Sequence, residues 1–145
     1  MIGIPEIKQG IVLVWAVWLS MVTLMNILEA FKALGLVPQN WKTSSNWTLM
    51  LRTTGIYHPP VWLVALLFGG VIVWEAVASG LLWWAFVTGS LEVATAAFGW
   101  CILLWGGFIL ANQFFMAWLT DPNLVAAHRS LFGVFVISLM AIRLL

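Results

Sequence analysis

Four long apolar stretches restrict what this chain can fold into. They cover about residues 10–31, 60–87, 91–119 and 122–144. Crossing roughly 30 Å of hydrocarbon takes about 20 helical residues, so each stretch is long enough to span a bilayer. Only 8% of the 145 residues are charged and 63% are hydrophobic, whereas about a quarter of the residues of a water-soluble domain are charged. The sequence predicts one domain over residues 1–145, an all-α integral membrane protein with four transmembrane helices in an up-down bundle.

Helix start and stop signals separate these stretches. They are Pro59-Pro60, Gly89, Ser90 and Asp121-Pro122. The turns after the second and third helices are short, whereas residues 33–59 form a long loop after the first. Inside this loop, residues 47–52 mix apolar and polar side chains, which is typical of an interfacial helix or of an irregular loop anchored by tryptophan. Four spans predict that both termini lie on one side of the membrane, opposite the loop.

The rest of the composition excludes several functions. The chain has six basic and five acidic residues, so it lacks the excess of positive charge that nucleic-acid binding requires. The single cysteine excludes an internal disulfide. The sequence contains no Ser-His-Asp, Cys-x-x-Cys, P-loop or dinucleotide-binding pattern. We therefore expect a protein that is not an enzyme. The basic residues are divided too evenly between the two sides to determine the orientation.

Glu75 is the most conspicuous polar residue because it lies near the centre of the second apolar stretch. An acid at that depth is costly in lipid and is expected to face the bundle interior or a wet cavity. Without a countercharge, a buried carboxyl group is expected to be protonated. Such a residue serves as a proton relay, as an ion site or as a hydrogen-bond anchor between helices.

Other polar residues fall into two groups. Depth along the predicted helices gives Glu75 four candidate neighbours, Ser20, Thr23, Trp105 and Ser138, and Ser79 lies one turn away on the same helix face. Nearby Gly106 and Gly107 would let the third helix approach its neighbours closely. A secondary polar group, expected toward the long loop, contains Asn26, Glu29, Asn112 and Gln113. Hydrogen bonding between helices is the favoured interpretation of this second group.

The two histidines, His58 and His128, fall at the starts of the second and fourth helices. Such a pair can ligate a haem or form half of a metal site. No other residue at metal-ligand spacing accompanies them, so interfacial histidines are the favoured interpretation and no cofactor or metal is predicted. The deeper tryptophans are compatible with packing or with a groove for a bound lipid or quinone.

Several stretches carry a family resemblance. They are residues 60–66, 75–82, 99–107, 115–118 and 126–129. The chain resembles a bacterial family described as predicted small integral membrane proteins, a four-helix domain of unknown function. The resemblance lies in a second helix that begins with Val-Trp-Leu, has a glutamate at its middle and then Gly-Leu-Leu, and in the aromatic end of the third helix. The resemblance implies a multi-pass protein of the bacterial cytoplasmic (inner) membrane and implies no reaction. The chain departs from the family in its short, uncharged turn after the second helix and in Ala111-Asn112-Gln113, where a small-residue pair is common.

Three functions remain open from the sequence. The preferred one is a non-catalytic accessory or scaffold subunit of a larger bacterial membrane complex of respiratory, photosynthetic or oxidoreductase type, whose partners are lipids and other membrane subunits. The alternative is a small transporter or proton-conducting oligomer centred on Glu75. The third is an electron-transfer module that binds quinone or haem.

Overall fold

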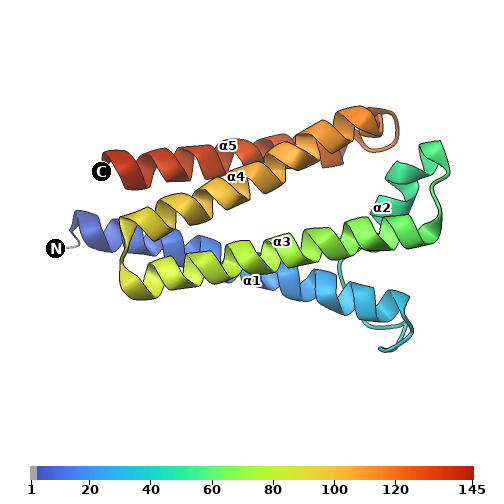
Figure 1. Cartoon of the computed structure of the whole chain (residues 1–145), viewed down its shortest axis with the longest axis horizontal. Helices are drawn as coiled ribbons and strands as arrows, with labels where there is room; N and C mark the ends of the chain where they lie inside the picture. Colours follow the sequence, from blue (N-terminus) through green and yellow to red (C-terminus); the bar gives the residue numbers. More distant parts are fainter. Residues whose placement is uncertain (1–2) are drawn as a thin grey trace.

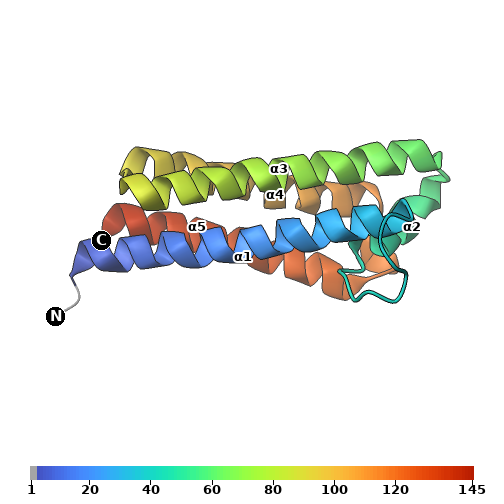
Figure 2. The ribbon, with the colours of Figure 1, turned by 90° about the horizontal axis from the view of Figure 1, so that it is seen from below.

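The computed structural model describes residues 3–145, which form helices joined by turns and one long loop. The elements are α1 (Ile4–Ala33), α2 (Asn46–Thr54), the 3-10 turn η1 (Gly55–Tyr57), α3 (Val61–Thr88), α4 (Leu91–Phe114), the 3-10 turn η2 (Ala117–Leu119) and α5 (Pro122–Leu144). The four long helices run alternately up and down the molecule (Figures 1 and 2). Each is long and apolar enough to cross a membrane. The predicted all-α membrane bundle with four spans is confirmed.

Local chemistry sets most helix ends. Gly89 ends α3 with a φ of +64°, a left-handed conformation that glycine adopts without steric cost. The Ser90 hydroxyl accepts the backbone N–H of Val93 at 3.3 Å and caps α4. Asp121 caps α5 in the same way, accepting from Leu124 at 3.0 Å. These signals are short-range, and they lie where the sequence predicts them.

Two helix ends differ from the prediction. α1 begins at Ile4 rather than near residue 10, because Pro5 in the first turn and the acidic Glu6 both favour a helix N-terminus. α4 ends at Phe114 rather than at residue 119, because Met116 has a φ of +49° and turns the chain before η2. In the long loop, the helical alternative is correct, since α2 includes residues 47–52.

Small side chains hold the helices together. Ala16, Ala78 and Ala97 are completely buried, which allows their helices to approach closely. Larger buried residues fill the remaining core, among them Leu19, Leu82, Phe98, Cys101 and Phe135. Many leucine, valine and tryptophan side chains point outward instead, which suits a lipid environment. Gly106 lies against the ring of Phe132, whereas Gly107 is exposed and makes no close approach.

The helices form a closed ring. α1 packs on α3, α3 on α4 and α4 on α5, and α5 returns to α1. The indole N–H of Trp15 closes the ring by donating to the Ser138 hydroxyl at 2.9 Å. The described ends of the chain lie at one end of the bundle, and α2 lies at the other (Figure 1). Interior space near α2 is therefore bounded by all five helices.

Candidate functional site: a polar cavity beside Glu75

A partly open cavity of about 340 Å³ lies in the half of the bundle that α2 covers. All four long helices contribute to its walls, and Leu49, Met50 and Thr53 of α2 form part of its lining at the loop end. Five aromatic side chains give the walls their apolar character: Trp18, Phe68, Trp105, Phe108 and Phe115. Its polar groups come from Asn26, Asn46, Glu75, Asn112 and His128, besides two threonines of α2. The cavity combines aromatic walls with a few convergent polar groups, as small-molecule sites do.

Glu75 of α3 lines this cavity and is only 2% exposed. Its hydrogen-bond partner is Asn26 of α1, whose amide nitrogen donates to both carboxyl oxygens at 3.1 and 2.9 Å. We expected the partner among mid-depth hydroxyl groups or the Trp105 indole, and that expectation is wrong. The amide of Asn26, which we assigned to the secondary polar group, instead joins that group to Glu75.

The carbonyl oxygen of the same Asn26 side chain connects Glu75 to the long loop. This oxygen accepts from the Ser44 hydroxyl at 3.0 Å and from the Asn46 amide at 2.7 Å. The Ser44 hydroxyl also contacts the carboxylate of Glu29, which is 5% exposed, and its single proton is shared between these two acceptors. The Glu29 carboxylate accepts the backbone N–H groups of Asn46 at 3.2 Å and Trp47 at 3.1 Å. An acid of α1 thus caps the N-terminus of α2.

Glu29 also borders a second hollow of about 730 Å³, which lies under the loop from Gln39 to Ser45. A series of hydrogen-bonded side chains connects the second hollow to the cavity. It begins at Glu29, which lines the second hollow, and passes through Ser44 and Asn26 to Glu75, which lines the cavity. Polar groups therefore run without interruption from the loop to the middle of α3.

A second polar pair lies across the cavity. The Asn112 amide nitrogen of α4 is 3.0 Å from Nδ1 of His128 on α5. An imidazole that accepts at Nδ1 is neutral and carries its proton on Nε2. The ring of His128 stacks on Phe108 with centroids 4.6 Å apart. We expected His128 at the interface, but it lies partly buried in the cavity wall.

Two buried donors in the cavity-lining residues have no hydrogen-bond partner among the described residues. They are the indole nitrogen of Trp105 and the hydroxyl group of Thr53. Its neighbour Thr54 shows the usual alternative, since its hydroxyl donates to the carbonyl of Met50 at 2.8 Å. A buried group without a partner requires a physical explanation, and a site that is completed by a further molecule provides one.

The remaining predicted residues lie outside this constellation. Ser20 hydrogen-bonds Ser79 at 2.7 Å, and Thr23 donates to the Leu19 carbonyl at 2.8 Å. Ser138 accepts from Trp15 as described above. Gln113 is exposed in the last turn of α4 and is separate from Asn26 and Glu29. The exposed His58 does not line the cavity with His128, and no three metal-ligating residues gather within residues 3–145.

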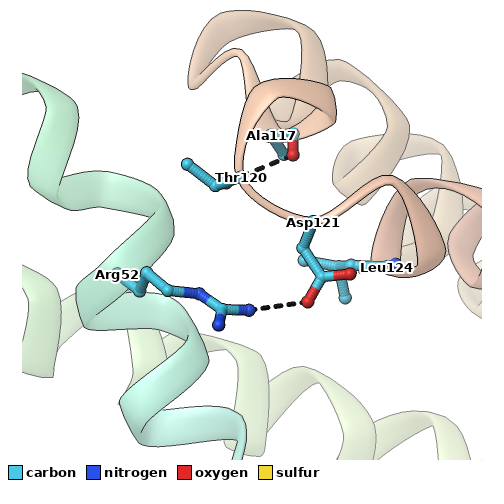
Figure 3. Close-up of polar contacts among 5 residues, drawn as sticks. All are labelled: Arg52, Ala117, Thr120, Asp121 and Leu124. Atoms are coloured by element: carbon cyan, nitrogen blue, oxygen red, sulfur yellow. Dashed lines mark hydrogen bonds and ion pairs between the residues drawn. The ribbon is translucent and has the colours of Figure 1, made fainter.

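One surface ion pair connects α2 to the start of α5. Arg52 and Asp121 approach to 2.6 Å, while the other carboxyl oxygen of Asp121 caps α5 at Leu124 (Figure 3). The Arg52 side chain is 55% exposed. Exposed pairs of this kind contribute less than about 1 kcal/mol. The buried contacts of Glu29 are therefore the stronger attachment of α2.

Sequence reasoning missed Ser44, Asn46 and Thr53, which the loop and α2 bring into the bundle. Their only signal is that all three lie within a few residues of the amphipathic segment at residues 47–52. No known protein family matches the sequence, and no curated protein or solved structure is significantly similar to it. Any function must therefore be argued from the cavity and its polar residues.

Proposed function

We propose that this chain is a non-catalytic membrane protein that binds a small amphipathic molecule in the cavity beside Glu75. The observation that carries the proposal is the cavity itself, a partly open hollow of about 340 Å³ lined by aromatic side chains around a buried carboxyl group. Ligand pockets are of this size and combine apolar walls with a few polar groups. The unpartnered donors of Trp105 and Thr53 support the proposal, because a ligand supplies acceptors.

The cavity changes which of the three functions left open by the sequence is preferred. It favours the class centred on Glu75, because a transporter and a simple binding protein both need such a site. A quinone would also be amphipathic and of suitable shape. Haem held by two histidines has no support, because only His128 lines the cavity.

A photoreactive probe tests this proposal. The protein in lipid nanodiscs is irradiated with 4-benzoylbenzyl alcohol, a small amphipath that attacks nearby C–H bonds, and the labelled residues are mapped by mass spectrometry. We expect strong labelling of Met50 in the cavity lining. Ala111→Phe fills the cavity from α4 and should reduce this labelling at least tenfold.

The chain supplies matched controls for this experiment. Met21 is 59% exposed on the outside of α1, so its labelling from the lipid phase should be the same in all variants. Ala76→Phe adds the same volume at an exposed position of α3 and should leave Met50 labelling unchanged. Labelling of Met50 that is no stronger than that of Met21, or that persists in Ala111→Phe, would contradict the proposal.

We also propose that the protein lies in the bacterial cytoplasmic membrane, with both termini on the side opposite the loop. The positions of the chain ends and of α2 support this topology (Figure 2). Cysteines at Glu6→Cys and Leu145→Cys should react with a membrane-impermeant maleimide from one side, and Thr43→Cys from the other. The native Cys101 is completely buried and gives little background. Reaction of all three from one side would mean that a span is wrong.

A second candidate is the accessory or scaffold subunit. Ala76 and Gly80, one helical turn apart, are both exposed on α3, where small residues would admit a partner helix. Gentle extraction followed by mass spectrometry should then recover a stoichiometric partner that Gly80→Ile releases. Recovery of the chain without a partner would count against this candidate and leaves the binding proposal standing.

A further inference from the structure

Glu75 is the one residue in the lining of the cavity that can carry a negative charge. None of the lining residues is lysine or arginine. Within residues 3–145, the only ion pair joins Arg52 and Asp121, outside the cavity. The partner of Glu75 is the neutral amide of Asn26. The site therefore offers a carboxyl group without a countercharge.

The remaining polar groups do not supply that countercharge. His128 accepts from Asn112 at Nδ1, so its ring is neutral. Asn46, Thr53 and Thr54 are uncharged. Both oxygens of Glu75 accept from the Asn26 amide, an arrangement that suits the ionised form, and an ionised carboxylate is stable inside a bundle only when it is paired. A ligand that fits the charge of this cavity is therefore a cation.

The walls select the kind of cation. The rings of Trp18 and Trp105 have centroids 6.2 Å apart, and Phe108 lies 5.4 Å from Trp105. Aromatic faces attract organic ammonium groups through their ring quadrupoles. A calcium or magnesium ion would need six or more oxygen ligands, whereas Asn26 turns its amide nitrogen toward Glu75. A zinc ion would need three or four histidine, cysteine or carboxylate ligands, and within residues 3–145 no three such residues lie together. The aromatic surroundings therefore fit an organic cation and do not fit a metal ion.

We infer that the amphipathic molecule is a hydrophobic organic cation whose positive centre pairs with Glu75, whose apolar part contacts the aromatic walls and whose own acceptor meets the free donors of Trp105 and Thr53. This inference rests on the proposed function, since it names the ligand class of the same cavity. The Asn26 amide holds the carboxyl group in place through two donated hydrogen bonds.

Two ligands of equal shape test the inference. Benzyltrimethylammonium and neopentylbenzene differ in one atom, the quaternary nitrogen of the first being a carbon in the second. Equilibrium dialysis of each, against the protein in phosphatidylcholine nanodiscs and against empty nanodiscs, separates cavity binding from partition into lipid. We expect the cation to bind the wild-type chain at least tenfold more tightly than the neutral isostere does.

Glu75→Gln should remove this preference. The glutamine side chain keeps the shape and an acceptor for Asn26 but no charge, so cation affinity should fall at least tenfold while the isostere binds equally to both chains. Equal binding of the two ligands to the wild-type chain would overturn the inference of a cation and leave the cavity proposal intact. Failure of both ligands to bind, together with unlabelled Met50, would contradict the proposed function itself. The wild-type comparison requires no variant and therefore decides the matter even if Glu75→Gln folds poorly.

Discussion

Asn26→Leu is expected to destabilise the folded bundle by about 2–4 kcal/mol. The Asn26 side chain has four hydrogen-bond contacts, two with Glu75 and one each with Asn46 and Ser44, whose proton it shares with Glu29. Interhelical hydrogen bonds in membranes contribute about 0.6 kcal/mol on average, and leaving a buried polar group without a partner costs about 1–3 kcal/mol more. Reversible unfolding in mixed micelles measures the effect. Thr23→Val is the control, because Thr23 is also buried but bonds only within its own helix.

A double-mutant cycle separates the Glu75 contact from the rest. Glu75→Leu alone should cost about 1–2 kcal/mol, and Glu75→Gln less, since glutamine retains an acceptor for Asn26. In Asn26→Leu/Glu75→Leu the buried carboxyl group is gone, so the double variant should cost less than the two single variants together. Strict additivity, or an Asn26→Leu cost no larger than that of Thr23→Val, would show that this contact does not stabilise the bundle. A Glu75→Gln chain that folds but no longer binds its ligand would assign Glu75 a role in function.

The fold could largely be predicted from the sequence because its signals are local. Span length, the glycine at residue 89 and the cap at Asp121 each act within a few residues. The end of α4 could not be predicted, because the apolar run continues through residue 119 while the backbone turns at Met116. The start of α1 was also predicted wrongly, because the prediction placed it where the apolar run begins. The helix extends beyond that run into the polar residues near Glu6.

The site could be predicted only in part. Glu75 stands out because a central acid is costly in lipid. Its partner was missed because residues were matched by depth, as if all spans were centred at one level. Asn26 lies seven residues from the loop end of α1 and Glu75 fourteen residues from the loop end of α3, so the two helices are staggered. Ser44 and Asn46 belong to a loop that folds back into the bundle, and periodicity carries no information about such contacts.

Glu29→Leu is expected to release α2. The Glu29 carboxylate accepts two backbone N–H groups at the start of α2 and the hydroxyl of Ser44. Loss of a helix cap costs about 0.5–2 kcal/mol, and a factor of ten corresponds to about 1.4 kcal/mol. Backbone amides of residues 46–57 should therefore exchange with deuterium about tenfold faster. Because Leu49, Met50 and Thr53 line the cavity, its loop end should open as well.

Two variants show whether this effect comes from the buried cap. Glu6→Leu removes an exposed acid from the other end of α1 and should leave exchange in α2 unchanged. Arg52→Leu breaks the exposed ion pair to Asp121 and should accelerate exchange only slightly, since that pair contributes less than about 1 kcal/mol. If Arg52→Leu accelerates exchange more than Glu29→Leu does, the surface ion pair holds α2 in place and Glu29 does not. If Glu29→Leu has the larger effect, as we expect, the Glu29 carboxylate holds α2 over the cavity. The same carboxylate begins the series of hydrogen bonds that ends at Glu75.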